Sequence, residues 1–177
     1  FEFPFGFKEL EGIHSRTDFD LGNHEKFSGK KLQYFDPELN QNYVPYVVET
    51  SIGLDRMFLA VLSTAYAEEQ LEDGSERVVL RIPPFLAPIK CAVLPLVKKD
   101  GLPEKAREIM DRLKFDHLCV YEEKDSIGKR YRRMDAIGTP FCITVDHDSI
   151  EQNTVTLRYR DSMQQERVSI DRLPEIV

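Results

Sequence analysis

The stretch VVETSIGLDRMFLAVLSTAYAEE, residues 47–69, passes from a strand-like apolar run through Ser51 and Gly53 into an almost wholly apolar segment. Its apolar residues recur at helical spacing over a wide face, which predicts a buried helix with Ser51 as its N-cap. Arg56 falls in the first turn, where free N–H groups and the helix dipole disfavour a cation. Because a guanidinium and free N–H groups together suit phosphate, the stretch predicts an anion site.

A second interpretation of Arg56 needs no ligand. The guanidinium can pair with a nearby carboxylate, Glu49 or Asp55, as surface arginines do. The spacing of these residues is compatible with either interpretation.

Acidic residues stand close to this stretch in the predicted sheet. Glu9 and Glu11 alternate in KELEGI (8–13), so they are expected on one face of a strand. Carboxylates in an apolar sheet hold an ammonium ligand or a cation such as Mg²⁺. An exposed edge strand explains them equally well. Glu49 ends an apolar strand and is placed to meet an ammonium group beside the predicted phosphate site.

The composition bounds the class of protein. The 177 residues are 41% apolar and 31% charged, with a net charge of −7, which is typical of a folded acidic protein. The longest apolar stretch is interrupted by Ser63 and Thr64, and FEFPFGFKELEG has no basic region, so we expect neither a membrane span nor a signal peptide. The three cysteines, Cys91, Cys119 and Cys142, lie in apolar runs, which predicts buried thiols in a reducing compartment, the cytoplasm.

The distribution of charge predicts two domains. Residues 1–84 carry 8 basic and 15 acidic residues, whereas residues 85–177 carry 16 of each. The change falls at RIPPFLAPIK, where three prolines punctuate the chain as an interdomain linker does. We therefore expect domains at 1–84 and 85–177.

The second domain has the pattern of an α/β sandwich. The predicted elements are strands over 90–97, 117–123 and 140–148, helices from 103 and over 126–138, and a hairpin of 154–161 and 165–171. This order predicts a mainly parallel sheet with an antiparallel edge.

The first domain has too few elements to bury its own apolar helix. The predicted elements are strands over 2–13, 31–35 and 43–50, a polar loop or helix over 14–29, and the helix from Ser51. Three strands and one long apolar helix bury each other poorly, so we expect this segment to be the tail of a larger domain.

A basic run on the second helix of the C-terminal domain is a candidate nucleic-acid contact. It comprises Lys129, Arg130, Tyr131, Arg132 and Arg133. The cations suit phosphates and Tyr131 suits stacking on a base, with Arg158 and Arg160 adding charge from a strand. A solvated helix face is the alternative, since four charged residues, 122–125, precede the run.

Three segments together resemble a known family. ETSIGLDR (49–56), followed by an apolar helix, resembles motif 3 of class II aminoacyl-tRNA synthetases, and ELEGIHSRTDFDL (9–21) resembles a segment of the α₂-type glycyl-tRNA synthetases. IGKRYRRMDAIGTPFCITVD (127–146) is similar to the anticodon-binding domain of the glycyl, threonyl, prolyl and histidyl enzymes. The resemblance covers essentially the whole chain. It implies an incomplete antiparallel-sheet tail of a class II catalytic domain, followed by a mixed-sheet α/β anticodon-binding domain.

The resemblance also implies roles for individual residues. Arg56 would be the motif 3 arginine, which grips ATP phosphate while the amino-acid carboxylate attacks the α-phosphorus. Thr50 stands where the family usually has Pro. The implied sites are ATP at Glu9, Leu10, Gly53, Leu54, Asp55 and Arg56, Mg²⁺ at Glu9, glycine at Glu49, Thr50, Ser51, Ile52 and Gly53, and tRNA at Lys129, Arg130, Tyr131, Arg132, Arg133 and Arg158.

The implied function is ligation of glycine to tRNA-Gly at the expense of ATP, by a cytoplasmic homodimer that does not engage a membrane. Motifs 1 and 2 have no counterpart in these residues, so the 177 residues alone are expected to be inactive but to retain tRNA binding. The alternative is a non-catalytic nucleic-acid-binding accessory module on the same fold, as in the accessory subunit of mitochondrial DNA polymerase. The combination of Glu9, Glu49, Ser51 and Arg56 favours the ligase.

Overall fold

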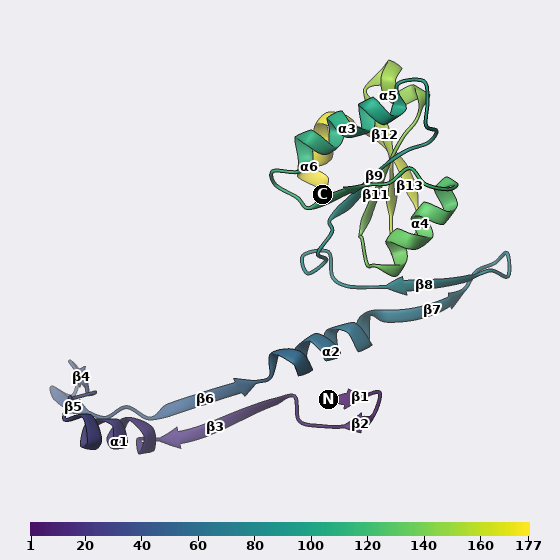
Figure 1. The fold of residues 1–177 in the computed structure, drawn as a ribbon. Helices are drawn as coiled ribbons and strands as arrows, with labels where there is room; N and C mark the ends of the chain where they lie inside the picture. The colour runs from purple at the N-terminus through teal and green to yellow at the C-terminus, as the bar shows by residue number, and fades with distance from the viewer. The chain divides into compact units, whose positions relative to one another are not determined.

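The computed structural model describes residues 1–177. The chain divides into two compact units, Phe1–Ala60 and Val61–Val177, which are described separately (Figure 1). The domain border expected between residues 84 and 85 stays a prediction. None of the helices has the length and apolar character needed to cross a bilayer.

The second unit is built on a five-stranded sheet in the order β10-β9-β11-β12-β13 (Figure 1). The strands are β9 (Cys91–Pro95), β10 (Cys119–Tyr121), β11 (Phe141–Val145), β12 (Thr154–Tyr159) and β13 (Gln165–Ser169). β9 runs parallel to β10 and β11, whereas β12 is antiparallel to both its neighbours. The predicted mixed α/β sheet with an antiparallel edge is confirmed.

Helices cover both faces of this sheet. They are α3 (Leu102–Leu113), α4 (Ile127–Ala136), α5 (His147–Gln152), the short 3₁₀ helix η1 (Ile170–Arg172) and α6 (Leu173–Ile176). Because successive side chains of a strand point to opposite faces of the sheet, every second side chain packs under α3, η1 and α6. On the other face, the strand residues Ala92, Leu94 and Cys142 pack against Met134 of α4. Burial on both faces explains why β9 reads as one continuous apolar run.

A hairpin of β7 (Tyr66–Gln70) and β8 (Glu76–Leu80) also belongs to the second unit, and β8 packs on α4. The sequence analysis did not predict this hairpin. Its turn carries Gly74 at φ 78°, and Asp73 accepts a hydrogen bond from the backbone N–H of Ser75 at 2.9 Å. The approach to α4 is close, because a Cβ on Gly138 would lie 3.1 Å from the Leu80 carbonyl oxygen.

The first unit consists of small antiparallel pairs of strands. Its elements are β1 (Glu2–Phe3), β2 (Gly6–Phe7), β3 (Glu11–Thr17), α1 (Phe19–Ser28), β4 (Tyr34–Asp36), β5 (Gln41–Tyr43), β6 (Val47–Ile52) and the start of α2 (Leu54–Ala65). The pairs are β1–β2, β3–β6 and β4–β5. The prediction of one strand over 2–13 was wrong, because the chain reverses at Gly6, with φ 100°, before β3 begins.

The start of α2 also differs from the prediction. Ser51 is not its N-cap, since Ser51 pairs with Gly12 in the β3–β6 ladder and the helix begins only at Leu54. The first turns of the helix are exposed instead of buried: Leu54 is 82% and Phe58 63% exposed. The two-stranded sheets of this unit supply no layer that covers them.

Candidate functional site

The β3–β6 ladder sorts the candidate residues of the first unit onto two faces. Opposed residues of an antiparallel pair project to the same face, and successive residues alternate. The pairs Gly12↔Ser51 and His14↔Glu49 therefore put Ser51 and Glu49 on one polar face. Thr50 and Ile52, two further residues of the expected glycine site, project from the opposite face.

Arg16 joins this polar face, and the sequence analysis did not single it out. Its guanidinium binds both carboxylate oxygens of Asp20, at 2.8 and 2.9 Å, and Nε lies 3.6 Å from Glu49 Oε2. Hydrogen bonding to Asp20 raises the pKa of Arg16, and the same bond lowers the pKa of Asp20. The i,i+4 spacing within RTDFD was the available sequence signal for this pair.

Arg56 reaches across to the segment that precedes β3. Its guanidinium donates a hydrogen bond to the main-chain carbonyl of Glu9, 47 residues earlier. The side chain is exposed, and Glu49 pairs with Arg16 rather than with Arg56. The structure thus differs from the ion-pair interpretation of Arg56. It leaves an exposed guanidinium at the N-terminal turn of an apolar helix.

The neighbourhood of Arg56 is open. A Cβ added to Gly53 would meet no atom closer than 3.9 Å, and that atom is the Cβ of Arg56. Leu54 and Asp55 are exposed beside it, and Leu10 is half-buried. Glu9 lies between β2 and β3, so it does not alternate with Glu11 along one strand as expected. Its exposed carboxylate offers oxygen atoms of the kind that Mg²⁺ binds.

On α4, the basic run divides between solvent and interior. Lys129 is exposed, and Arg132 and Arg133 are half-buried. Arg130 is only 2% exposed and donates to the carbonyls of Pro95, Glu122 and Leu96, at 2.6, 3.3 and 3.2 Å. This corrects its expected place on the surface: carbonyls around the end of β9 hold it inside, where burial lowers its pKa.

Tyr131 and Arg158 are likewise turned inward, which corrects the expectation that both are surface contacts. The Tyr131 hydroxyl lies 2.6 Å from Thr144 Oγ1, and the Arg158 guanidinium lies 4.7 Å from the centre of the Tyr131 ring. Arg158 is 4% exposed and binds both carboxylate oxygens of Asp135, at 2.8 and 3.0 Å. Burial disfavours its charge, but the hydrogen bonds and charge of Asp135 prevail and raise its pKa.

Asp135 lies at the centre of a buried charge network. Besides Arg158, Asp135 pairs with Arg77 of β8, whose Nε lies 3.1 Å from Asp135 Oδ2. The side chains of Arg77 and Asp135 are both 0% exposed. Arg77 also approaches Glu69 at 3.3 Å and donates to the carbonyl of Arg160. Burial lowers the pKa of Arg77, against the opposing charge of Asp135. The network fastens the hairpin to α4.

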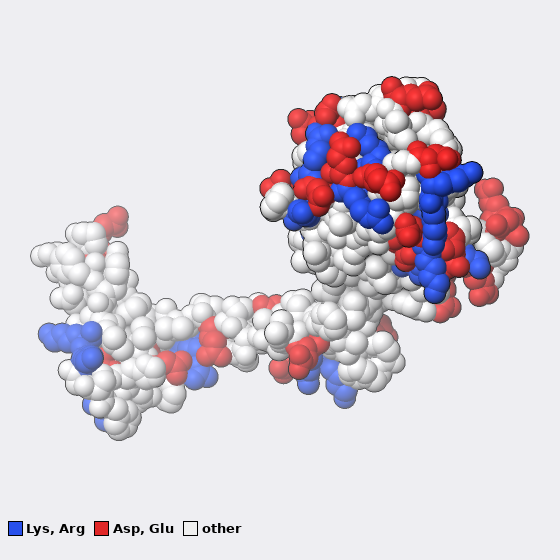
Figure 2. Space-filling model, turned by 45° about the horizontal axis from the view of Figure 1, so that its top comes forward, with Lys and Arg blue, Asp and Glu red and all other residues white.

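The surface charge of the second unit is mixed. Figure 2 shows Lys and Arg side chains interspersed with Asp and Glu on the visible face rather than gathered into one basic area. Arg133 follows this pattern, since it contacts Asp125 at 3.0 Å and Glu122 at 3.3 Å. Lys129 and Arg132 are therefore the members of the run that keep solvent access without a salt bridge to a carboxylate.

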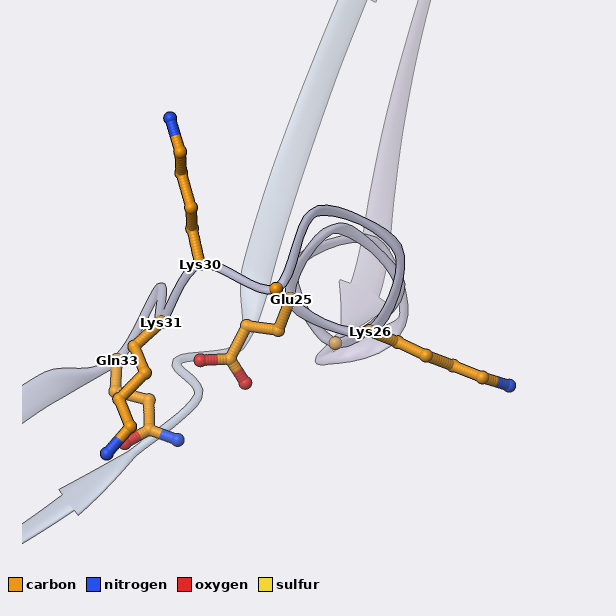
Figure 3. Close-up of a pocket in the computed structure, with 7 residues that line it drawn as sticks. Glu25, Lys26, Lys30, Lys31 and Gln33 are labelled. Atoms are coloured by element: carbon orange, nitrogen blue, oxygen red, sulfur yellow. The ribbon is translucent and has the colours of Figure 1, made fainter.

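A hollow at the C-terminal end of α1 does not resemble a binding site. Lys26, Lys30 and Lys31 line it with Glu25. Figure 3 shows the side chains of Lys26 and Lys30 pointing away from each other and out of the hollow. Glu25 Oε1 accepts the backbone N–H of Leu32 at 2.7 Å, so it closes the loop after the helix. The lysines do not converge on a common ligand position.

Comparison with known proteins shows what the two units are similar to. Residues 90–177 match the family described as "Anticodon binding domain". The whole chain aligns with the glycine–tRNA ligase of Chlorobaculum tepidum, at 55% identity over 177 residues. The ligase of Borrelia hermsii is 54% identical over 175 residues, 98% of this chain, and that of Treponema denticola is 55% identical over 173 residues, 95% of this chain. The chain is therefore similar to glycine–tRNA ligases over its whole length.

The chain spans 37% to 39% of the length of these glycine–tRNA ligases and corresponds to their C-terminal region. Its matched anticodon-binding domain contains α4 and the buried partners Asp135 and Arg158. The β7–β8 hairpin precedes residue 90 and lies outside the matched residues, although β8 packs on α4. Arg77, which contacts Asp135, therefore joins a hairpin outside the matched range to the anticodon-binding domain.

Proposed function

We propose that the chain is the C-terminal part of an enzyme that activates glycine with ATP and transfers it to tRNA-Gly. The observation that carries the proposal is the exposed guanidinium of Arg56. It has no carboxylate partner, and a hydrogen bond to the main-chain carbonyl of Glu9 holds it near that residue. Homology to glycine–tRNA ligases over the whole chain supports it. We further propose, as the resemblance to class II synthetases implies, that the enzyme is a homodimer that acts in the cytoplasm and does not engage a membrane.

The residues around Arg56 suit the chemistry of glycine activation. Arg56 stabilises negative charge on the phosphates of ATP while the carboxylate of glycine attacks the α-phosphorus. The open space at Gly53 lets a phosphate approach the backbone next to the free N–H groups of the first turn. The exposed carboxylate of Glu9 would supply an oxygen ligand to Mg²⁺, and the ion would neutralise phosphate charge.

The polar face of the β3–β6 ladder suits the other substrate. Glu49 accepts hydrogen bonds from the ammonium group of glycine, and the Ser51 hydroxyl, on the same face, donates to its carboxylate. Arg16, 3.6 Å from Glu49, orients the Glu49 carboxylate. A pocket of this kind excludes larger amino acids sterically, which is the easier direction of discrimination.

The tRNA contacts belong to the second unit. Lys129 is exposed on α4 and Arg132 is half-buried there, within the residues that match the anticodon-binding family. Arg133 adds charge between Glu122 and Asp125. These cations bind phosphates of the anticodon stem-loop, and the inward side chains of Arg130, Tyr131 and Arg158 maintain the position of α4.

Exposed apolar side chains support the assignment of the first unit to a larger catalytic domain. Ile13 and Val48 are 68% and 71% exposed on one face of β3–β6, and Leu54 and Phe58 are exposed on α2. Clustered exposed apolar surface is typical of a surface that another part of a protein covers. Since the chain spans 37% of the Chlorobaculum relative, we propose that the rest of the catalytic domain covers it.

The experiment compares full-length enzyme carrying Arg56→Gln or Arg56→Lys with the unchanged enzyme in glycine-dependent ATP–pyrophosphate exchange. Loss of one transition-state contact predicts a fall in kcat of about 10²–10³-fold for Arg56→Gln. The exposed Lys98→Gln is the control and is expected to leave the rate unchanged. Unaltered exchange in both Arg56 variants would overturn the proposal. The 177 residues alone are expected to show no exchange.

The non-catalytic accessory module remains the second candidate, because the exposed cations of α4 serve nucleic-acid binding in either case. It predicts that Arg56→Gln leaves nucleic-acid binding intact and that the full-length protein has no exchange activity to lose. Measuring exchange and nucleic-acid binding with the unchanged enzyme and its Arg56 variants therefore distinguishes the two functions.

A further inference from the structure

Two cysteines of the second unit meet across neighbouring strands. Cys91 of β9 and Cys119 of β10 are register partners in a parallel pair, and their Sγ atoms lie 3.1 Å apart. Both are free thiols. Cys91 is fully buried, whereas Cys119 is half-buried on β10, which is an edge strand of the sheet.

This placement is compatible with a covalent bond between the sulfurs. Neighbouring strands lie about 4.7–4.9 Å apart, which falls within the roughly 4.4–6.8 Å of Cα separation that disulfides bridge. The sulfurs already face one another, so the strands need little movement. The third thiol, Cys142, pairs in register with Ala92 and lies in the core under α4, on the other face of the sheet.

The two thiols differ in reactivity. The hydrogen bond from the Cys91 S–H lowers the pKa of Cys119, whereas that same hydrogen bond and burial raise the pKa of Cys91. Burial raises the pKa of Cys142 to about 12. The thiolate is the reactive form of cysteine, so Cys119 is the thiol that an oxidant reaches first. Its neighbour Leu118 is 62% exposed, in keeping with access to this edge.

We propose that Cys91 and Cys119 form a peroxide-sensitive dithiol that closes reversibly into a disulfide. The Cys119 thiolate attacks a hydroperoxide, an S–O bond forms as the O–O bond breaks, and the sulfenic acid and an alcohol or water result. The Cys91 thiol then attacks that sulfur, the S–O bond breaks, and water leaves with the thiol proton. Overall, two thiols lose two electrons to the hydroperoxide, and a reducing thiol restores them.

The disulfide would close the chain between β9 and β10, which includes α3. Closing a loop of this length restricts the unfolded chain, and the midpoint of thermal unfolding is expected to rise by about 5–10 °C. Formation of the disulfide also protects Cys119 from irreversible oxidation to sulfinic acid. Neither effect depends on the proposed ligase activity, so the inference stands or falls separately from it.

The test treats the full-length enzyme with hydrogen peroxide, blocks the remaining thiols and maps peptides by mass spectrometry. We expect a cross-linked peptide pair containing Cys91 and Cys119, about 2 Da lighter than the two free peptides because two thiol hydrogens are lost, that disappears on reduction. In Cys91→Ala the resolving thiol is gone, and we expect a sulfenic acid at Cys119 that a dimedone probe traps. Alanine is chosen because a serine hydroxyl would lack a partner in this core.

The matched control is Cys142→Ala, which removes the other buried thiol and is expected to leave the cross-link and its rate unchanged. The inference is overturned if Cys119 proceeds to sulfinic acid without a cross-link in the unchanged enzyme. It is also overturned if Cys142 is oxidised as fast as Cys119, or if Cys91→Ala yields no trapped sulfenic acid. Peptide mapping reads each outcome directly, so a loss of stability in one variant does not obscure it.

Discussion

Replacing Asp135 by Asn tests whether one buried carboxylate holds the hairpin, α4 and β12 together. The substitution keeps the volume of the side chain and removes its charge. Asp135 neutralises two guanidiniums, Arg77 at 3.1 Å and Arg158 at 2.8 Å, and all three side chains are at most 5% exposed. Without that charge, both cations stay buried; Arg77 keeps Glu69, at 3.3 Å, as a counterion, and Arg158 keeps no ion pair.

The size of the effect follows from burial. Breaking a buried ion pair by removing one partner costs about 3–5 kcal/mol, because the remaining charge is desolvated without compensation. Two guanidiniums depend on Asp135, so we expect a loss of about 4–5 kcal/mol in the free energy of unfolding of the second unit. Domains are stable by about 5–15 kcal/mol, so this loss removes about a quarter or more of the total. It corresponds to a fall of about 15–20 °C in the midpoint of thermal unfolding.

The measurement is urea unfolding of the chain, with the native and unfolded signals fitted for each variant. Asp111→Asn is the control, because its ion pair with Lys114 is exposed and contributes less than about 1 kcal/mol. Replacing Arg77 and Arg158 by Met in the Asp135→Asn background should recover part of the loss, since apolar residues of similar volume remove the uncompensated charges. The reasoning is refuted if Asp135→Asn costs no more than Asp111→Asn.

Two further predictions concern tRNA binding and acid stability. Replacing Lys129 and Arg132 by Gln in the full-length enzyme should weaken tRNA binding. The slope of the logarithm of the binding constant against the logarithm of the salt concentration should fall in magnitude by about 1.5–2, whereas the control Lys99→Gln should leave it unchanged. An unchanged slope in the double variant would exclude these two contacts. Hydrogen bonding from Arg167 lowers the pKa of Asp146, so Asp146 stabilises the fold above the unfolded pKa of about 4 and loses this contribution as pH falls through the folded pKa. Asp146→Asn should therefore be less stable at about pH 6 and should lose less stability between about pH 5 and 2, as followed by urea unfolding at each pH.

Local pattern was sufficient for the sheet and helices of the second unit. The apolar run that became β9 and the i, i+3, i+4, i+7 spacing within α3 reflect burial on both strand faces and on one helix face. The mixed sheet followed from the order of elements. The β7–β8 hairpin was missed because neither YAEEQ nor ERVVL alternates apolar and polar residues, although Asp73-Gly74 is a strong hairpin signal.

The side-chain environment of the arginines could not be read from the sequence. The sequence around a basic residue looks the same whether its side chain contacts solvent or carbonyl groups far along the chain. Arg130 binds the Pro95 carbonyl 35 residues earlier, and Arg158 binds a carboxylate 23 residues earlier. Ser51 failed as a predicted cap for a related reason, since pairing with Gly12, far back in the chain, keeps it in an extended strand.

The buried and the solvent-exposed residues of the basic run on α4 therefore need to be mutated separately. Positions 127, 130, 131, 134 and 135 follow the i, i+3, i+4, i+7, i+8 spacing of a buried helix face, so Arg130 and Tyr131 are interior residues that happen to be polar. Removing Arg130 with its neighbours would leave the carbonyls of Pro95 and Leu96 without their donor and destabilise the end of β9. Weakened tRNA binding in such a variant would then report misfolding, not a lost contact. Only substitutions confined to the solvent-facing side of α4 separate recognition from stability.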